Sequence, residues 1–398
     1  MEEWKYNRTD NNDQISPAAY GQPDAPPPPP PPEAAQSDSS ETGSTPQKEK
    51  KKRKKWPIVA GSIAAVVLLL LLGLFLYVNS LLNLLNRTKI EGSPDESFSA
   101  FVGEEEFYDE PDTVEAMNSA VADFDAIREY DLAYSPKVRN ILLIGSDSRT
   151  ASFSGLADSV ILVSINQESG KIHLSSLTRT MYVYIPGRDD FNMLNASYAW
   201  GGTEMLIDTI ETNFRVKIDE HMAINFSNFE KVINIAGGVD ITLTAEEAEY
   251  LHYESAGTYH MDGAQALAYS RLRHLDTDFM RTGRQRAVIE ALVLKAGDMN
   301  ISQLTQMVYE IFPNINTSMT NFEILGLIAQ MGEIAGYDLS QTMLPLECSI
   351  VSNPFTTRMY VNHMEMYWFD YKENIELLWK FIHDKEEVKD VPTIPFER

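Results

Sequence analysis

A run of twenty-one residues without a charge, at positions 58–78, most constrains what this chain can fold into. In a helix it would extend about 31 Å, close to the ~30 Å hydrocarbon thickness of a bilayer. A cleaved signal peptide would have a shorter apolar region and would lie nearer the N-terminus. Residues 56–80 are therefore predicted to form a single transmembrane helix.

A dense basic run, KEKKKRKK at positions 48–55, precedes this apolar segment. Lys and Arg are enriched on the cytoplasmic side of membrane spans. The sequence thus predicts a single-pass, type II protein of the cell membrane, with a cytoplasmic N-terminus and an extracytoplasmic C-terminal domain. Membrane topology and attraction to anionic lipids explain the basic run better than nucleic-acid binding does.

The regions on either side of the apolar segment differ from a globular domain in composition. Residues 1–55 include seven consecutive prolines at 26–32 and are predicted to be a disordered, Pro-rich cytoplasmic tail, either a spacer or a ligand for a partner. Residues 81–135 are predicted to be an acidic juxtamembrane stalk, with a helix over 113–130. The net charge of −25 argues against a nucleic-acid partner.

Short apolar runs bounded by Gly, Ser and Asp recur between residues 136 and 390, which is typical of strands buried on both faces. They alternate with longer segments of helical periodicity, so the sequence predicts one extracytoplasmic α/β domain, a single mixed-sheet α/β/α domain on a transmembrane anchor. Strands are expected at 140–144, 159–165, 172–177, 182–185, 223–226, 239–243 and 341–346, the second and third forming an antiparallel hairpin. Helices are expected after Gly201-Gly202 to about 214, and at 228–235, 245–252, 263–269, 281–298, 301–312, 319–335 and 373–382.

Five arginines are concentrated in sixteen residues of this acidic chain: Arg271, Arg273, Arg281, Arg284 and Arg286. Arg271 and Arg273 would face one side if the chain is extended there. Arg281, Arg284 and Gln285 are spaced i, i+3, i+4 and would share one helix face. Converging guanidinium groups predict a site for a phosphorylated anion, because their donors match phosphate oxygens. The alternative is a solvated network with neighbouring acidic residues.

Two carboxylates are expected beside each other at the end of the first predicted strand. Asp147 follows Gly145 there, and Asp158 opens the next strand. If the strands are neighbours, both would lie at one edge of the sheet, where they could hold Mg²⁺ together with phosphate oxygens and water. Turn or cap residues are the alternative interpretation.

Several motifs occur in an order that is similar to one known family. They are NILLIGSDSR (140–149), ADSVILVSI (157–165), SLTRTMYVYIPG (176–187), LNASYAWGG (194–202), GGVDI (237–241) and DGAQALAYSRLRHLDTDFMRTGRQR (262–286). With these motifs the chain resembles the LytR-CpsA-Psr family of bacterial cell-envelope phosphotransferases, and the predicted membrane topology agrees.

The resemblance implies an Mg²⁺-dependent transfer of a glycopolymer, such as teichoic acid or capsule, from a polyprenyl-pyrophosphate lipid to peptidoglycan in a Gram-positive bacterium. Which glycopolymer is handled stays open. Helices 281–298, 301–312 and 319–335 could form the apolar pocket for the lipid, with ordinary helix-to-sheet packing as the alternative. Carried over residue by residue, the metal ligands would be Asp147 and Asp158, which with Arg179 form the catalytic group, and the pyrophosphate would be bound by Arg179, Arg271, Arg273, Arg281, Arg284 and Gln285.

Three positions depart from the family pattern by losing a charged group: Leu156, where an arginine is usual, Thr180, where an aspartate is usual, and Met193, where a lysine is usual. Thr180 cannot act as a general base near neutral pH. A non-catalytic member that binds polyprenyl phosphate or cell-wall glycan is therefore one alternative function, and a pyrophosphate hydrolase using the same site is another.

Overall fold

A six-stranded mixed sheet organises the part of the chain that the structure describes. The structure is a computed structural model that describes residues 111–147, 155–272, 278–311, 315–345, 356–361 and 364–396, together with Leu72, Gly73, Leu76 and Ser80. The strand order is β10-β7-β2-β3-β4-β11. These strands are β2 (Val138–Ser146), β3 (Ala157–Asn166), β4 (Lys171–Leu177), β7 (Glu220–Asn225), β10 (Asn316–Thr317) and β11 (Asp338–Leu344).

The sheet mixes both pairing directions. β2 is parallel to β7, and β4 is parallel to β11. β3 lies between β2 and β4 and is antiparallel to both, and β10 is antiparallel to β7. The predicted mixed sheet and the predicted antiparallel hairpin of β3 and β4 are therefore confirmed.

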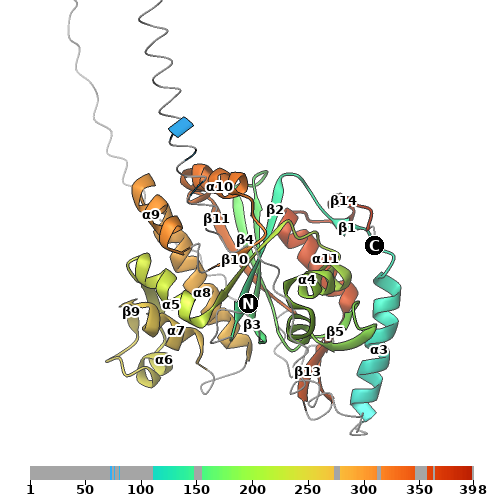
Figure 1. Ribbon diagram of the computed structural model, residues 1–398. Coiled ribbons are helices and arrows are strands. Elements are labelled where there is room, and N and C mark those ends of the chain that lie inside the picture. The colour runs from blue at the N-terminus through green and yellow to red at the C-terminus, as the bar shows by residue number, and fades with distance from the viewer. Residues whose placement is uncertain are drawn as a thin grey trace, which may run out of the picture. The chain divides into compact units, whose positions relative to one another are not determined.

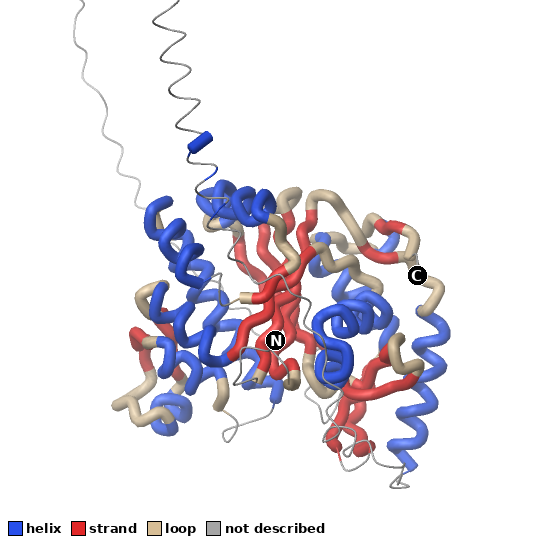
Figure 2. Tube along the Cα trace, viewed as in Figure 1, coloured by secondary structure: helices blue, strands red, loops and turns tan. Residues whose placement is uncertain are grey.

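Side chains of the central strands alternate between two hydrophobic layers. In β2, Leu142 and Ile144 pack into one cluster, while Ile141 and Leu143 pack into another on the opposite face of the sheet. This alternation follows from the pleat of a strand and explains why β2 is apolar along its length. Figure 1 shows helices on both faces of the sheet, and Figure 2 shows the strands between the two groups of helices.

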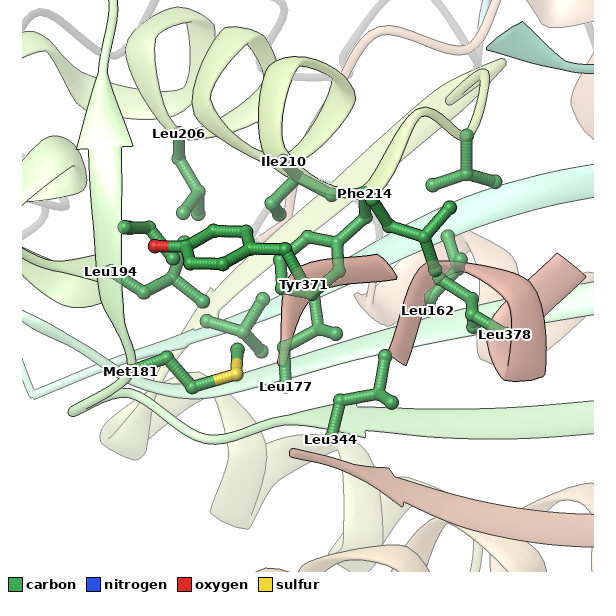
Figure 3. Close-up of a cluster of buried hydrophobic side chains, with 14 of the residues drawn as sticks. Leu162, Leu177, Met181, Leu194, Leu206, Ile210, Phe214, Leu344, Tyr371 and Leu378 are labelled. Atoms are coloured by element: carbon green, nitrogen blue, oxygen red, sulfur yellow. The ribbon is translucent and has the colours of Figure 1, made fainter. Parts of the chain in front are cut away.

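On one face lie α3 (Pro111–Ile127), α4 (Leu194–Phe214) and α11 (Tyr371–His383). Figure 3 shows Tyr371 among Leu194, Ile210 and Phe214 of α4. The Tyr371 hydroxyl donates a hydrogen bond to the carbonyl of Tyr182, so this fully buried polar group has a partner. The same layer includes the hairpins β5 (Tyr182–Ile185) with β6 (Asp190–Met193) and β12 (Thr356–Val361) with β13 (Met364–Phe369), and the C-terminal η2 (Val388–Asp390); β1 (Leu132–Ala133) pairs with β14 (Thr393–Ile394).

The helices on the other face surround the candidate site. They are α5 (Phe226–Ile235), α6 (Ala245–Tyr250), α7 (Gly263–Ser270), α8 (Asp278–Gly297), α9 (Ile301–Ile311) and α10 (Asn321–Ile334), with the hairpin β8 (Val239–Leu243) and β9 (Gly257–Met261). The predicted helices in this region are all present. Thr244, Asp262 and Thr320 begin α6, α7 and α10 with capping boxes, which satisfy the first backbone N–H groups of each helix.

Helix α4 begins earlier than predicted. A helix was expected only after the Gly201-Gly202 pair, yet α4 starts at Leu194 and continues through a kink at Gly202, where φ is 64° and ψ is −151°. A residue with a Cβ atom rarely adopts this conformation. Gly202 therefore separates two helical segments of α4, and the second begins directly after the glycine pair, as predicted.

The predicted stalk is wrong in its C-terminal part. The helix predicted over 113–130 is present as α3, but it is not part of a stalk, because Ala120, Phe124 and Ile127 of α3 are buried in the core. These three residues recur at i, i+4 and i+7, the spacing of one helix face. Residues 132–133, also assigned to the stalk, form β1. The folded region therefore begins at or before residue 111 rather than at 136, and residues 81–110 lie outside the described residues.

The predicted transmembrane segment cannot be located in the structure. Of residues 56–80, only Leu72, Gly73, Leu76 and Ser80 are described, and the predicted tail at 1–55 lies outside the described residues. Among the helices that the structure does describe, none is both long enough and apolar enough to cross a bilayer.

Candidate functional site

One edge of the sheet collects the predicted site residues of the first half of the domain. β2, β4, β7 and β11 point in the same direction, so their C-terminal ends meet at one edge with the beginning of the antiparallel β3. Asp147 follows β2, Asp158 lies at the start of β3, and Arg179 follows β4. Ligands of α/β proteins commonly bind beyond such strand ends.

Asp147 and Asp158 are brought to adjacent positions by an irregularity in the pairing of β2 and β3. Gly145 pairs with Ser159 and Ser146 pairs with Ala157, so Asp158 is an extra residue on β3. A Cβ atom on Gly145 would lie only 3.0 Å from the Cβ of Ser159, which explains glycine at this position. Such bulges redirect side chains at the ends of strands.

Each of the two carboxylates already has a partner. The backbone N–H of Leu156 donates to Oδ1 of Asp147 at 3.0 Å, which closes the turn between the strands. The Arg179 guanidinium donates to Oδ1 of Asp158, and both side chains are largely buried. The structure therefore brings Asp158 and Arg179 together directly.

An apolar cavity of about 360 Å³ opens beside this edge, between the sheet and the helices of the α8 face. Four of the predicted site residues line it: Asp158, Arg271, Arg281 and Gln285. Its apolar lining comes from β2, β7, α5 and α7 to α10 and includes Phe226, Phe229, Ile289, Leu292, Met307 and Met331. We call this cavity, with the charged and amide side chains that line it, the lined pocket.

The helical spacing predicted for α8 is correct for two of its three side chains. Arg281 and Gln285, four residues apart, both line the pocket, and Arg281 is 4% exposed. Arg284 is not among the lining residues. Its guanidinium donates to Oε1 of Glu247 at 3.3 Å and to the carbonyl of Leu272 at 2.8 Å.

Arg271 reaches the pocket from the end of α7. Its guanidinium carbon lies 4.5 Å from the centre of the Phe226 ring, in a cation–π contact. Arg273 lies outside the described residues. Sequence reasoning missed Asn225 and Phe226, which also line the pocket. A signal was present, because an asparagine that ends a strand just before a helix is a typical N-cap.

The side chains at the three departures from the family pattern carry no charge into this region. Met193 is 8% exposed and belongs to the hydrophobic cluster on the α4 face. The carbonyl of Leu156 accepts the backbone N–H of Asp147, and the carbonyl of Thr180 accepts the backbone N–H of Tyr367. Leu156 and Thr180 therefore contribute backbone hydrogen bonds beside the site.

Buried polar groups support the end of β2. Tyr198 of α4 is 1% exposed, and its hydroxyl is hydrogen-bonded to the side chain of Ser146, the residue before Asp147. Burial is the largest cause that raises the pKa of Tyr198, and the nearby charge of Asp147 raises it further. Tyr198 thus stays a neutral phenol next to the carboxylate.

The donors at this edge fit magnesium better than a transition metal. Among the described residues, no group of three or more His, Cys, Asp or Glu side chains could hold a metal ion. Mg²⁺ differs from zinc in needing only one or two protein carboxylates, since phosphate oxygens and water complete its coordination. Asp147 and Asp158, at adjacent strand ends, are oxygen donors of that kind.

The described part of the chain is thus a three-layer α/β/α domain in which two arginines line an apolar cavity. The LytR_cpsA_psr family model matches residues 108–379 of this chain. The chain therefore belongs to the LytR-CpsA-Psr family, as the sequence motifs indicated.

Two curated relatives are named polyisoprenyl-teichoic acid--peptidoglycan teichoic acid transferase TagU. The protein from Bacillus cereus is 29% identical over 191 residues, which cover 47% of this chain and 62% of the relative. That from Enterococcus faecalis is 31% identical over 186 residues, covering 46% and 61%. The matched region thus spans about three fifths of these relatives.

A solved structure of TagT, described as bound to LIIa-WTA, matches with a TM-score of 0.50 at 22% identity. The match covers 65% of this chain and 93% of the TagT chain. At this identity the likeness supports the fold alone.

Proposed function

We propose that this protein transfers a glycopolymer from a polyprenyl-pyrophosphate lipid to peptidoglycan, forming a phosphodiester. The lined pocket carries this proposal, because Arg271, Arg281 and Gln285 line the same apolar cavity of about 360 Å³. Such a pocket suits an apolar tail with an anionic head. Family membership and relatives named as teichoic acid transferases support the same function.

The chemistry requires charge neutralisation and alignment. A hydroxyl of the acceptor sugar attacks the phosphorus nearest the glycan, the bond from that phosphorus to the bridging oxygen breaks, and lipid phosphate leaves with the bond's electron pair. Arg271, Arg281 and Gln285 would bind the pyrophosphate oxygens, with Arg179 held beside them through Asp158. Donors already in place for developing charge lower the barrier.

Asp147 and Asp158 would hold Mg²⁺, which when bound supplies positive charge against the pyrophosphate oxygens. The acceptor's proton would pass to water, because the Asp158 carboxylate is paired with Arg179 and Asp147 would be held by the metal. The membrane anchor proposed for residues 56–80 would keep the domain close to a lipid substrate.

One observation favours a second function. Met193 is packed in the hydrophobic cluster, and Leu156 and Thr180 add no charge, so the site has fewer charged groups than the family pattern. Each charge-assisted hydrogen bond contributes roughly 1.5–3 kcal/mol. The missing charged groups would matter less to a family member that binds the lipid without transferring the glycan, or to one that hydrolyses the pyrophosphate, than to a transferase.

The discriminating experiment gives the full-length chain in detergent a lipid-pyrophosphate glycan, Mg²⁺ and peptidoglycan fragments. Lipid phosphate released with glycan attached to the fragments supports transfer, and free glycan supports hydrolysis. Binding without either product would contradict both catalytic functions. The products are separated by mass spectrometry.

Two variants test the assigned roles. Arg271→Ala is expected to weaken lipid-pyrophosphate binding by about tenfold or more, since one charge-assisted contact is lost. Asp147→Asn is expected to remove the dependence of the rate on Mg²⁺. The matched control is Arg188→Ala, because Arg188 is an exposed arginine that also stacks on an aromatic ring, Trp200, but does not line the pocket. Equal losses in Arg188→Ala and Arg271→Ala would mean the site is misplaced.

A further inference from the structure

Arg271 differs from the neighbouring arginines in what its guanidinium contacts. Arg179 is paired with Asp158 and Arg284 with Glu247. Among the residues that the structure describes, no carboxylate forms an ion pair with Arg271, and its guanidinium instead lies over the ring of Phe226 at 4.5 Å. Arg271 is also exposed at the pocket, where a long side chain would otherwise sample many rotamers.

The position of the Phe226 ring is fixed by the fold. Phe226 is the first residue of α5 and directly follows β7 of the central sheet. Asn225, the last residue of β7, is 4% exposed, and its side chain caps the helix by accepting the N–H of Asn228 at 2.9 Å. The ring is thus attached to the same sheet edge that carries Asp158 and Arg179.

A ring under a guanidinium restrains the cation without using its donors. The ring face attracts the positive charge as a whole, and the ring has no oxygen that would accept from the five N–H donors. The edge that matches two phosphate oxygens stays available. A carboxylate partner would restrain Arg271 equally well, but it would occupy that edge and compete with an anionic ligand.

We propose that Phe226 is a positioning residue for Arg271, holding its guanidinium over the ring so that its donors are oriented for a diphosphate before the ligand binds. This inference rests on the proposed function, in which Arg271 binds the pyrophosphate. Restricting a flexible side chain in its bound orientation increases affinity because less entropy is lost on binding.

The test compares two ligands that share a tail, geranylgeranyl diphosphate and geranylgeraniol, bound to the full-length chain in detergent with Mg²⁺ and measured by calorimetry. Phe226→Leu keeps an apolar side chain but removes the ring. It is expected to weaken diphosphate binding about three- to tenfold more than alcohol binding. Phe226→Tyr restores a ring and is expected to recover most of the lost diphosphate affinity.

Phe229 provides the matched control, since it lies one turn along α5 and lines the same pocket, and no cation of the described residues lies above its ring. Phe229→Leu is expected to weaken both ligands by the same factor. In the Arg271→Ala background, Phe226→Leu should add no loss specific to the diphosphate. Equal effects of Phe226→Leu on the two ligands, or an undiminished effect in that background, would overturn the positioning role. A wild-type chain that binds the diphosphate no better than the alcohol would instead overturn the proposed function on which it rests.

Discussion

At the scale of single residues, adjacent turns of α8 present arginines to different surroundings. Arg281 lines the pocket, whereas Arg284, three residues later, is 3% exposed in its side chain and pairs with Glu247, which is 10% exposed. Removing one member of a buried ion pair leaves an uncompensated charge. The structure thus gives Arg284 a role in joining α8 to α6, although the motif predicted pyrophosphate binding.

Arg284→Met is expected to lower the free energy of unfolding by about 3 kcal/mol, measured by denaturant titration of the full-length chain. Combining it with Glu247→Gln should recover part of that loss, because the buried charge is removed while the side chain can still accept the Thr244 N–H of the capping box. Diphosphate affinity of the folded Arg284→Met protein should stay within about threefold of wild type. A tenfold or greater loss of affinity at unchanged stability would instead place Arg284 in the binding site.

At the scale of elements, the kink in α4 depends on one backbone conformation. Gly202 has a positive φ of 64° inside the helix, which an L side chain rarely adopts. We expect Gly202→Ala to destabilise the protein by about 1–3 kcal/mol. Gly326→Ala in α10 is the matched control, since no atom lies within 4 Å of an added Cβ there, and it should stabilise by about 0.5–1 kcal/mol. Both values come from thermal unfolding, and a neutral Gly202→Ala would contradict the assigned strain.

Two buried histidines lie where the end of α11 packs against the sheet. His383, in the last turn of the helix, is 2% exposed, and His173 of β4 is 1% exposed. Burial, with a smaller contribution from the charge of Lys385, lowers the pKa of His383 to about 4. Burial also lowers the pKa of His173, although the neighbouring Asp384 carboxylate opposes this. Both groups therefore favour the folded state when they are uncharged.

Acid should weaken this attachment. Because the folded pKa of His383 lies below its ordinary value near 6.5, the unfolded chain takes up the proton first, and stability is lost as pH falls from about 6.5 to about 4. The loss from His383 is at most about 3 kcal/mol. Urea unfolding at several pH values checks this. His383→Gln, which cannot titrate, should show a shallower decline than wild type over that window, and parallel curves would contradict the assignment.

At the scale of the whole molecule, local patterns predicted most of the fold. The apolar runs of β2 and β3 and the turn between β3 and β4 are encoded in a few consecutive residues, so the central strands and their pairing could be anticipated. The i, i+4 spacing placed Arg281 and Gln285 on one face. The sequence could not show that Arg284 would form an ion pair with Glu247, because the two residues are far apart in the chain and many acidic residues were possible partners.

Composition misled the prediction where a helix has one apolar face. The acidic character of residues 81–135 suggested a stalk, yet Phe124 and Ile127 face the core while Asp125, between them in the sequence, is exposed. The bulge at Asp158 and the contact of Arg271 with Phe226 depend on three-dimensional register, which no single segment contains. The bulge and this contact determine where the side chains of Asp158 and Arg271 lie in the candidate site.

The lined pocket also has a thermodynamic meaning. The side chains around this volume of about 360 Å³, among them Leu292, Met307 and Met331, lack the dispersion contacts that a filled hydrophobic core would give them. A bound apolar tail would act as the absent part of the hydrophobic core. At a concentration one hundred times its Kd, such a ligand adds about 2.7 kcal/mol to the stability of the fold. The protein would then be most resistant to unfolding while it is loaded, and least resistant just after its lipid has left.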